Sequence, residues 1–416
     1  MNLLLKTKLN LSKFLLIFGI SFNFINATSD ISQDNSDIVS IEINSGKTKI
    51  ATFSVECNDT NLGNAISNSL ILTSRFAKAD ENSCDLKIKI TYANIQAKIE
   101  IFDVLQKKIL KSFNVTCVDK KELMNEIANQ IYTTWLNEPG LFKTNLIFAR
   151  AINSNLKILS SLEFAENCAK DISSPISYLS DLLPVHNSIF ITKFCVKSRG
   201  FAVFNYDRYK KRFGKIITIK NGSVFSPFVV DNVLYVCASN NGTTGIFSLE
   251  NAFHTHRFSS YENFEKNVTN IIKVPKKITT SLTINEIGAV FCANFNGTPS
   301  LFYSTSKKIN VASCKKISTN GAYYDPVLFG SSIAAIKVFE KKFHLIVFNL
   351  QTKTENVLFS KYHIGKPCWS PCGKWLCVSF REKGENNKIA LIHKSGRYVR
   401  IISSNENLTN PIWINS

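Results

Sequence analysis

The chain has 416 residues, of which 44% are hydrophobic, and its formal net charge is +19. This length is too great for one ordinary hydrophobic core, and the hydrophobic content excludes an intrinsically disordered chain. The excess of positive charge favours anionic partners, such as an acidic protein or an envelope surface.

The first 27 residues have the pattern of a secretory signal peptide. Lysines precede the short apolar run 14–22, and Ala27 ends a stretch suited to cleavage. The run is shorter than the roughly 20 apolar residues of a membrane-spanning helix, and no later segment is long enough. A retained N-terminal anchor is the alternative. The sequence therefore predicts an exported protein that is peripheral to the membrane and has no nucleic-acid partner.

Between residues 28 and 140, the pattern predicts a small domain of mixed strands and helices. Short apolar runs and alternation of apolar with polar residues predict strands at 38–43, 50–55, 86–92 and 97–103. Apolar residues at helical spacing predict a helix at 61–76.

A second helix is expected after residue 119. Asp119 and Glu122 have the spacing of a capping box, in which each side chain accepts a hydrogen bond from the backbone near the other. An apolar stripe then runs from Leu123 to Trp135 with a period of four residues. Pro139-Gly140 ends this helix and the domain.

From residue 141 to 416, short strands alternate with turns, and the helical period disappears. An opening followed by two apolar strands recurs at 223–249, 325–348 and 367–392. Repeats of about 40–50 residues with several strands each are typical of the blades of a β-propeller. The remaining length fits six blades best. A β-sandwich is the alternative, but it does not explain why proline and aromatic residues recur at the openings.

The stretch PCWSPCGKWLC at 367–377 places Cys368, Cys372 and Cys377 close together. A zinc site would need four ligands, usually in tight pairs from two loops, and the sequence has no matching second pair. Ser370 to Gly373 suits a type I turn, so the three cysteines fall in one strand, on the turn and in the next strand. We interpret this stretch as a blade hairpin, and we expect no metal site, cofactor or catalytic residue in the chain.

The same stretch resembles the blade motif P-x-W-S-P-D-G-K of the TolB family, the periplasmic propellers of the Tol–Pal cell-envelope system. Residues 41–46, 137–144 and 410–413 resemble, in the same order, that family's N-terminal segment, domain junction and closing strand. Cys372 stands where the family has Asp, and the motif is eroded in the earlier blades. The resemblance implies an α+β N-terminal domain at 28–140 and a six-bladed β-propeller at 141–416, located in the periplasm.

The resemblance also implies a non-enzymatic scaffold that supports outer-membrane integrity and cell division. The propeller mouth would bind the peptidoglycan-associated lipoprotein Pal, with other outer-membrane lipoproteins as further candidates. The N-terminal segment would bind TolA by adding a strand to a sheet edge, through Ile38, Val39, Ile41 and Ile43.

Candidate mouth residues lie in the loops that enter the innermost strands. Tyrosine, histidine and lysine at a rim combine apolar area with charge, which suits a protein partner. The candidates are Lys220, Asn221, Tyr323, Tyr324, His363 and Lys366.

Two other classes of function remain open. A secreted propeller hydrolase, such as a glycosidase, would need clustered carboxylates on the inner strands, whereas the blade openings show mostly Ser, Asn and aromatic residues. A basic glycan- or envelope-binding module would bind peptidoglycan without a protein partner.

Overall fold

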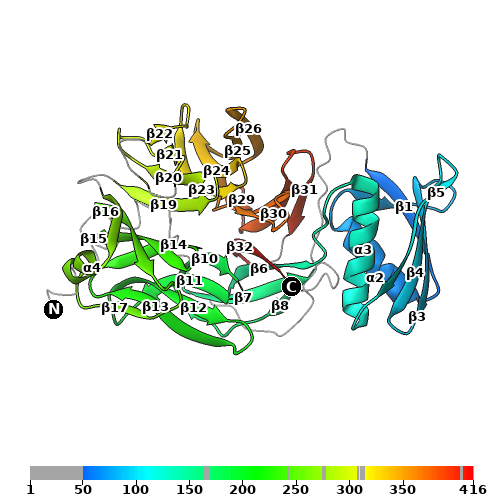
Figure 1. Cartoon of the computed structure of the whole chain (residues 1–416), viewed down its shortest axis with the longest axis horizontal. Coiled ribbons are helices and arrows are strands. Elements are labelled where there is room, and N and C mark those ends of the chain that lie inside the picture. The colour runs from blue at the N-terminus through cyan, green and yellow to red at the C-terminus, as the bar shows by residue number, and fades with distance from the viewer. Residues whose placement is uncertain are drawn as a thin grey trace.

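The computed structural model describes residues 50–163, 169–186, 188–240, 243–273, 278–306, 309, 314–402 and 406–415. The expected signal peptide and the expected TolA-binding residues Ile38, Val39, Ile41 and Ile43 lie outside the described residues. Within the described part of the chain, a small domain of strands and helices lies beside a propeller of six sheets (Figure 1). No helix in this part is long and apolar enough to cross a membrane.

The N-terminal domain is a five-stranded sheet with two helices packed on one face (Figure 1). Its strands follow the order β2-β1-β3-β4-β5, and β1 is parallel to both of its neighbours. The elements are β1 (Ala51–Cys57), α2 (Thr60–Ile71), β2 (Phe76–Lys78), β3 (Leu86–Ala93), β4 (Gln96–Asp103), β5 (Lys108–Thr116) and α3 (Lys120–Leu136). Apolar side chains of the helices and of one face of the sheet form a single core.

The start of α3 follows the expected capping box with one shift. The Asp119 carboxylate accepts a hydrogen bond from the backbone N–H of Glu122 at 2.7 Å. The Glu122 carboxylate reaches back to the N–H of Val118 at 3.2 Å, one residue earlier than a capping box predicts. The other helix, α2, is shorter than expected, because the chain turns through Ser74 at φ 55° and Phe76 already begins β2.

The propeller closes into a ring because its last strand pairs with its first. The last strand, β32 (Leu408–Asn415), pairs antiparallel with β6 (Thr144–Ala151) and becomes the inner strand of the first blade. Each of the inner strands β32, β10, β14, β19, β23 and β28 contacts the inner strand of the next blade, which completes the ring.

The blades are numbered in order around the ring. The first contains β32, β6, β7 (Leu156–Glu163), β8 (Ala169–Asp171) and β9 (Ile176–Ser177). The second contains β10 (Leu179–Val185), β11 (Ser188–Cys195), β12 (Gly200–Asp207), β13 (Arg212–Ile219) and β17 (His256–Phe258). The third contains β14 (Ser223–Val230), β15 (Val233–Asn240), β16 (Thr243–Glu250) and β18 (Thr269–Lys273).

The remaining blades complete the circle. The fourth contains β19 (Thr279–Asn285), β20 (Gly288–Ala293), β21 (Ser300–Ser304) and β22 (Lys315–Lys316). The fifth contains β23 (Ala322–Phe329), β24 (Ser332–Phe339), β25 (Lys342–Asn349) and β26 (Thr354–Lys361). The sixth contains β27 (His363–Ile364), β28 (Cys368–Trp369), β29 (Trp375–Arg381), β30 (Lys388–His393) and β31 (Val399–Ile402).

The third blade departs from the expectation that helices end before the propeller. Residues Tyr261–Asn267 form the short helix α4, whose N-terminus is capped by the Ser260 hydroxyl. Before it, β17 leaves the third blade and pairs parallel with β13 of the second. Phe264 of α4 is fully buried against Phe247. This tertiary contact stabilises a helix that is too short to be stable by itself.

The hairpin at residues 367–377 is confirmed. Cys368 lies in β28, Cys372 lies on the turn and Cys377 lies in β29. The backbone N–H of Gly373 donates to the carbonyl of Ser370 at 2.9 Å, as a type I turn predicts. Gly373 itself has φ 64°, a conformation that glycine adopts without strain.

The N-terminal domain rests against the sixth blade. The buried guanidinium of Arg400 donates to the carbonyl of Leu72 at 2.8 Å. Arg75 lies over the ring of Tyr398 at 4.3 Å, and His393 Nε2 lies 3.3 Å from the Glu138 carboxylate. These contacts come from the ends of β30 and β31 that meet at one turn, so the domain covers the end of the propeller where the inner strands finish.

Candidate functional site: the mouth of the propeller

The opposite end of the propeller carries the loops that the sequence analysis selected. The inner strands all begin at this end, and we call it the mouth face. The chain enters β6 at Thr144, which pairs with Asn415 at the finishing end of β32, so the N-terminal domain leaves the mouth face uncovered. Loops that converge on a rigid scaffold in this way are the usual place for binding residues.

Each inner strand is interrupted close to its beginning. Register shifts occur between Leu179 and Asp181, Phe225 and Phe228, Thr279 and Ser281, Tyr324 and Val327, and Thr409 and Ile412. In the sixth blade the interruption splits the inner strand into β27 and β28. Such bulges change the direction of side chains. Here they lie near the beginning of every inner strand.

The residue before each repeated proline occupies the bulge. Ser226, Asp325 and Asn410 each precede a proline and have φ of 47°, 49° and 53°. Lys366 has the same place before Pro367 in the sixth blade. The recurrence of proline that identified the blades therefore also marks the bulges of the inner strands.

Three charged side chains from these bulges form what we call the channel cluster: Asp181, Asp325 and Lys366. The ammonium of Lys366 lies 2.8 Å from the carboxylate of Asp181. The two residues belong to the sixth and second blades, which the first blade separates, so they meet only inside the ring. Beside them, the amide of Asn410 donates to the carbonyl of Ser180 at 2.8 Å.

The electrostatics of the channel cluster are coupled. Burial raises the pKa of Asp325 to about 6, while the Lys366 ammonium lowers it and the Asp181 carboxylate raises it. Burial opposes the charge on Lys366, yet Asp181 and Asp325 hold the pKa of Lys366 above its ordinary value. The positive charge of Lys366 thus interacts with two carboxylates.

Lys220 and Asn221 lie exposed on the mouth face, at the entrance to β14. The N–H of Asn221 donates to the carbonyl of Ser198 at 2.8 Å, which joins this loop to the turn between β11 and β12. A Cβ on Gly200 would lie 1.8 Å from the carbonyl oxygen of Gly222, so only glycine permits this approach.

This approach gathers positive charge. We call the exposed residues Lys197, Arg199 and Lys220 the basic corner. Lys197 and Arg199 were not among the residues selected from the sequence, because their turn joins β11 to β12 and does not enter an innermost strand. In the sequence, only the glycines at 200 and 222 indicated that the backbones of these two loops could lie close together.

Tyr323 and Tyr324 have different positions. Tyr323 is fully buried, and its hydroxyl donates to the Glu355 carboxylate at 2.7 Å. The Lys337 ammonium donates to the other oxygen of Glu355 at 2.7 Å. The side chain of Tyr323 is therefore part of the fifth blade's interior and not of the exposed rim. Tyr324 is half-buried, and burial together with Cys292 and Asp325 raises its pKa.

His363 and Lys366 lie between the rim and the channel. His363 is half-buried against Phe343, with ring centroids 5.0 Å apart. Burial and the charge of Arg381 lower the pKa of His363, so its imidazole stays neutral at neutral pH. Lys366 belongs to the channel cluster, below the exposed rim.

Exposed apolar side chains also occur on the mouth face. They lie in the turns and loops that gather there, with exposed fractions between 37% and 76%. They are Ile152, Tyr178, Val196, Phe339 and Tyr362. The face therefore combines apolar area with the basic corner, which is the composition of a protein-binding surface.

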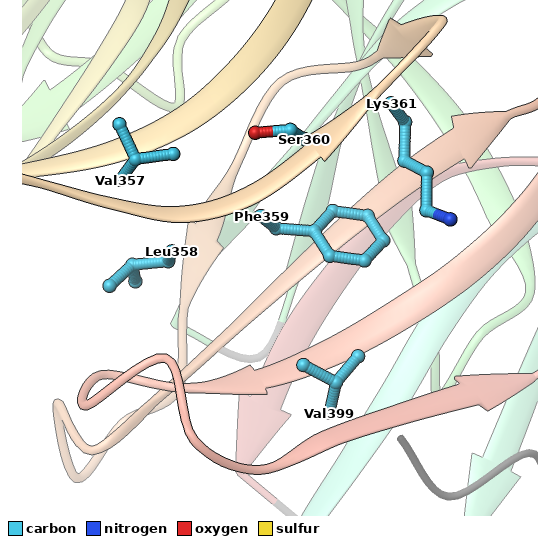
Figure 2. A pocket seen from close by; sticks show the side chains of 6 residues that line it. All are labelled: Val357, Leu358, Phe359, Ser360, Lys361 and Val399. Atoms are coloured by element: carbon cyan, nitrogen blue, oxygen red, sulfur yellow. The ribbon is translucent and has the colours of Figure 1, made fainter. Parts of the chain in front are cut away.

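A separate hollow of about 360 Å³ lies on the side of the propeller (Figure 2). It is lined by the β26 residues Val357, Leu358, Phe359, Ser360 and Lys361 and by Val399 of β31. The ammonium of Lys361 pairs with Glu382. The lining includes no carboxylate, histidine or cysteine, and among all described residues no group of three such side chains is placed to hold a metal ion.

The sequence matches no protein-family model and no curated protein. The structure resembles solved propellers. A crystal structure of TolB from Acinetobacter baumannii superposes with a TM-score of 0.72 at 15% identity and covers 90% of this chain and 99% of that one. Hydrazine synthase from Kuenenia stuttgartiensis superposes with a TM-score of 0.51 at 11% identity, over 67% of this chain and 48% of that one. The fold is therefore TolB-like, with a six-bladed β-propeller.

Proposed function

We propose that this chain is a non-enzymatic scaffold of the Tol–Pal system in the periplasm, which supports outer-membrane integrity and cell division. Its mouth face binds Pal, and its N-terminal segment binds TolA. The observation that carries this proposal is the uncovered mouth face, which presents exposed apolar side chains and a basic corner on a TolB-like fold.

The experiment is a calorimetric titration of residues 28–416 with the soluble domain of Pal from the same organism. We expect a saturable one-to-one complex. The variants Arg199→Glu and Lys220→Glu reverse charges in the basic corner and should weaken binding at least about tenfold, by roughly 1.4 kcal/mol or more. Lys108→Glu changes an exposed lysine on β5 of the N-terminal domain and is the matched control, which should bind as the unchanged chain does.

The TolA part of the proposal requires a separate measurement. Removing residues 28–44 should abolish binding of TolA and leave the Pal titration unchanged. Loss of both interactions on this truncation, or retention of both, would contradict the assignment of the two partners to two different sites.

A glycan-binding function is the second candidate, because the basic corner and aromatic side chains such as Tyr178 are exposed on the same face. Sedimentation of the chain with purified peptidoglycan, in the absence of any protein partner, decides between them. Binding to peptidoglycan that Arg199→Glu removes, together with no heat from Pal, would establish the glycan-binding function instead.

The structure adds one fact that bears on the hydrolase alternative. Asp181 and Asp325 are carboxylates on inner strands, which the sequence analysis did not select. Asp181 is paired with Lys366 at 2.8 Å, which supports a structural role for this carboxylate. We therefore retain the scaffold as the proposed function.

A further inference from the structure

Two cysteines of the sixth blade lie directly opposite each other. Cys368 of β28 and Cys377 of β29 are partners in the antiparallel register. Opposite residues in such a pair have Cα atoms about 4.5 or 5.5 Å apart, and both values lie within the range that a disulfide spans. No other two cysteines of the described residues are partners in a strand register.

The two side chains lie in contact on one face of the sheet. Cys377 is fully buried in the cluster formed by the sixth and first blades, and Cys368 packs against the same cluster. The hydrogen bond from Cys377 lowers the pKa of Cys368, and the positive charge of Lys366 acts in the same direction. Burial raises the pKa of Cys377. One thiol is therefore the better nucleophile and the other is held as a thiol beside it.

The exposure of the two residues differs in the same sense. Cys368 is half-buried, whereas Cys377 has no exposed surface. An external reagent thus meets Cys368 first, and Cys377 is placed to act only on a sulfur that Cys368 has already bound. This is the arrangement of an attacking and a resolving cysteine.

We propose that Cys368 and Cys377 are a redox-active thiol pair, which a disulfide donor oxidises to a cross-strand disulfide. The Cys368 thiolate attacks one sulfur of the donor, forms a mixed disulfide and releases one donor thiolate. Cys377 then loses its proton and attacks the Cys368 sulfur, which releases the second donor thiolate. The two protein thiols lose two electrons and two protons, and the donor is reduced to two thiols.

The bond would lie where the ring closes. The Cys377 thiol donates to the carbonyl of Pro411 at 3.5 Å, and Pro411 belongs to the closing strand β32. Lys366 of the channel cluster is two residues before Cys368. A disulfide would therefore link β28 to β29 next to the closing strand β32. It would also lie close to the ion pair between Lys366 and Asp181.

The test is refolding of residues 28–416 from urea in a buffer of reduced and oxidised glutathione, followed by alkylation of the free thiols and digestion with trypsin. Cleavage after Lys374 separates Cys377 from Cys368 and Cys372, so a linked pair of peptides reports the bond. We expect that link in the unchanged chain and in Cys372→Ser, and its absence in Cys368→Ser. The oxidised protein should also favour the folded state at least about tenfold more than the reduced protein.

Recovery of Cys368 and Cys377 as separate alkylated peptides from the refolded, unchanged chain would overturn the proposal. So would a link that persists in Cys368→Ser, because it would assign the bond to Cys372. The unchanged chain is the primary sample, so the outcome does not depend on whether a cysteine variant folds.

Discussion

The ammonium of Lys366 lies 2.8 Å from the carboxylate of Asp181, although a whole blade separates the strands that carry them. The contact is possible because the bulges of the inner strands turn these side chains into the channel. It joins the sixth blade to the second across the closing strand. The channel is therefore held by charge as well as by the ladder of β32 and β6.

We expect Lys366→Met to destabilise the propeller. Removing one partner leaves the other charge uncompensated, which costs about 3–5 kcal/mol for a fully buried pair. The side chains of Lys366 and Asp181 are 26% and 15% exposed. The expected loss of stability is therefore smaller than for a fully buried pair. We expect the free energy of unfolding in urea to fall by about 2 kcal/mol.

The double variant Lys366→Met with Asp181→Leu is the control for this prediction. Replacing both members of a buried ion pair by apolar side chains is often neutral, so the double variant should recover much of the lost stability. A loss in the double variant equal to the sum of the two single losses would show that the two residues are not coupled.

Asp325 should make the propeller less stable at neutral pH than in mild acid. Its pKa is raised from 3.8 to about 6 in the folded state, mainly by burial, so the folded protein binds a proton that the unfolded chain releases. Stability from this group is lost as the pH rises from about 4 to about 6. Asparagine, like aspartate, adopts the left-handed backbone conformation of residue 325 readily. Asp325→Asn should therefore raise the free energy of unfolding at pH 7.5 by about 2 kcal/mol.

Urea unfolding of both proteins at pH 4 and at pH 7.5 checks this prediction. The gain from Asp325→Asn should vanish at the lower pH, where the unchanged Asp325 is already protonated. A gain of the same size at both values would show that the carboxylate is not the cause.

His393 should act in the opposite direction at the interface between the domains. Burial lowers its pKa from 6.5 to about 4, although the Glu138 carboxylate opposes this shift. The folded state therefore excludes a proton that the unfolded chain binds, and stability is lost as the pH falls from about 6.5 to about 4. His393→Gln should remove this acid sensitivity, as measured by the urea midpoint between pH 7 and pH 4.

His254→Gln is the matched control, because His254 lies exposed in a turn of the third blade. It should leave the acid sensitivity as it is in the unchanged chain. An equal effect of the two substitutions would mean that the acid sensitivity does not come from the burial of His393 against the N-terminal domain.

Gly200→Ala should disrupt the loops of the basic corner. The new Cβ would lie 1.8 Å from the carbonyl oxygen of Gly222, which is backbone and cannot rotate away. We expect a loss of about 2–3 kcal/mol in the free energy of unfolding. Gly214→Ala is the control, because nothing lies within 4 Å of its new Cβ, and its stability should change little. Similar midpoints for both variants in urea would contradict the close approach of the two loops.

Local patterns predicted much of the secondary structure. Alternation placed β3 and β4 within one residue of their observed bounds, and the spacing of Asp119 and Glu122 marked the start of α3. The recurrence of Pro326, Pro367 and Pro411 marked blade openings correctly. The short α4 was missed, because one or two helical turns carry no periodic signal, and it is stabilised by Phe247 of another element.

The candidate site was predicted less well, for a physical reason. A sequence shows which loop a residue belongs to, and it placed Lys220 and Asn221 on the exposed rim. It does not show which side chains from different blades meet. Tyr323 therefore entered the prediction although it is buried against Glu355, and Arg199 was left out although its loop lies beside Lys220.

The sequence by itself determined the repeat, the strand alternation and the turn chemistry, because each depends on residues close together in the chain. Only the tertiary structure decided that Asp181, Asp325 and Lys366 share one channel and that Cys368 lies opposite Cys377. Those relationships depend on the register of the strands and on the closure of the ring. Both are set by how the apolar faces of all six blades pack together.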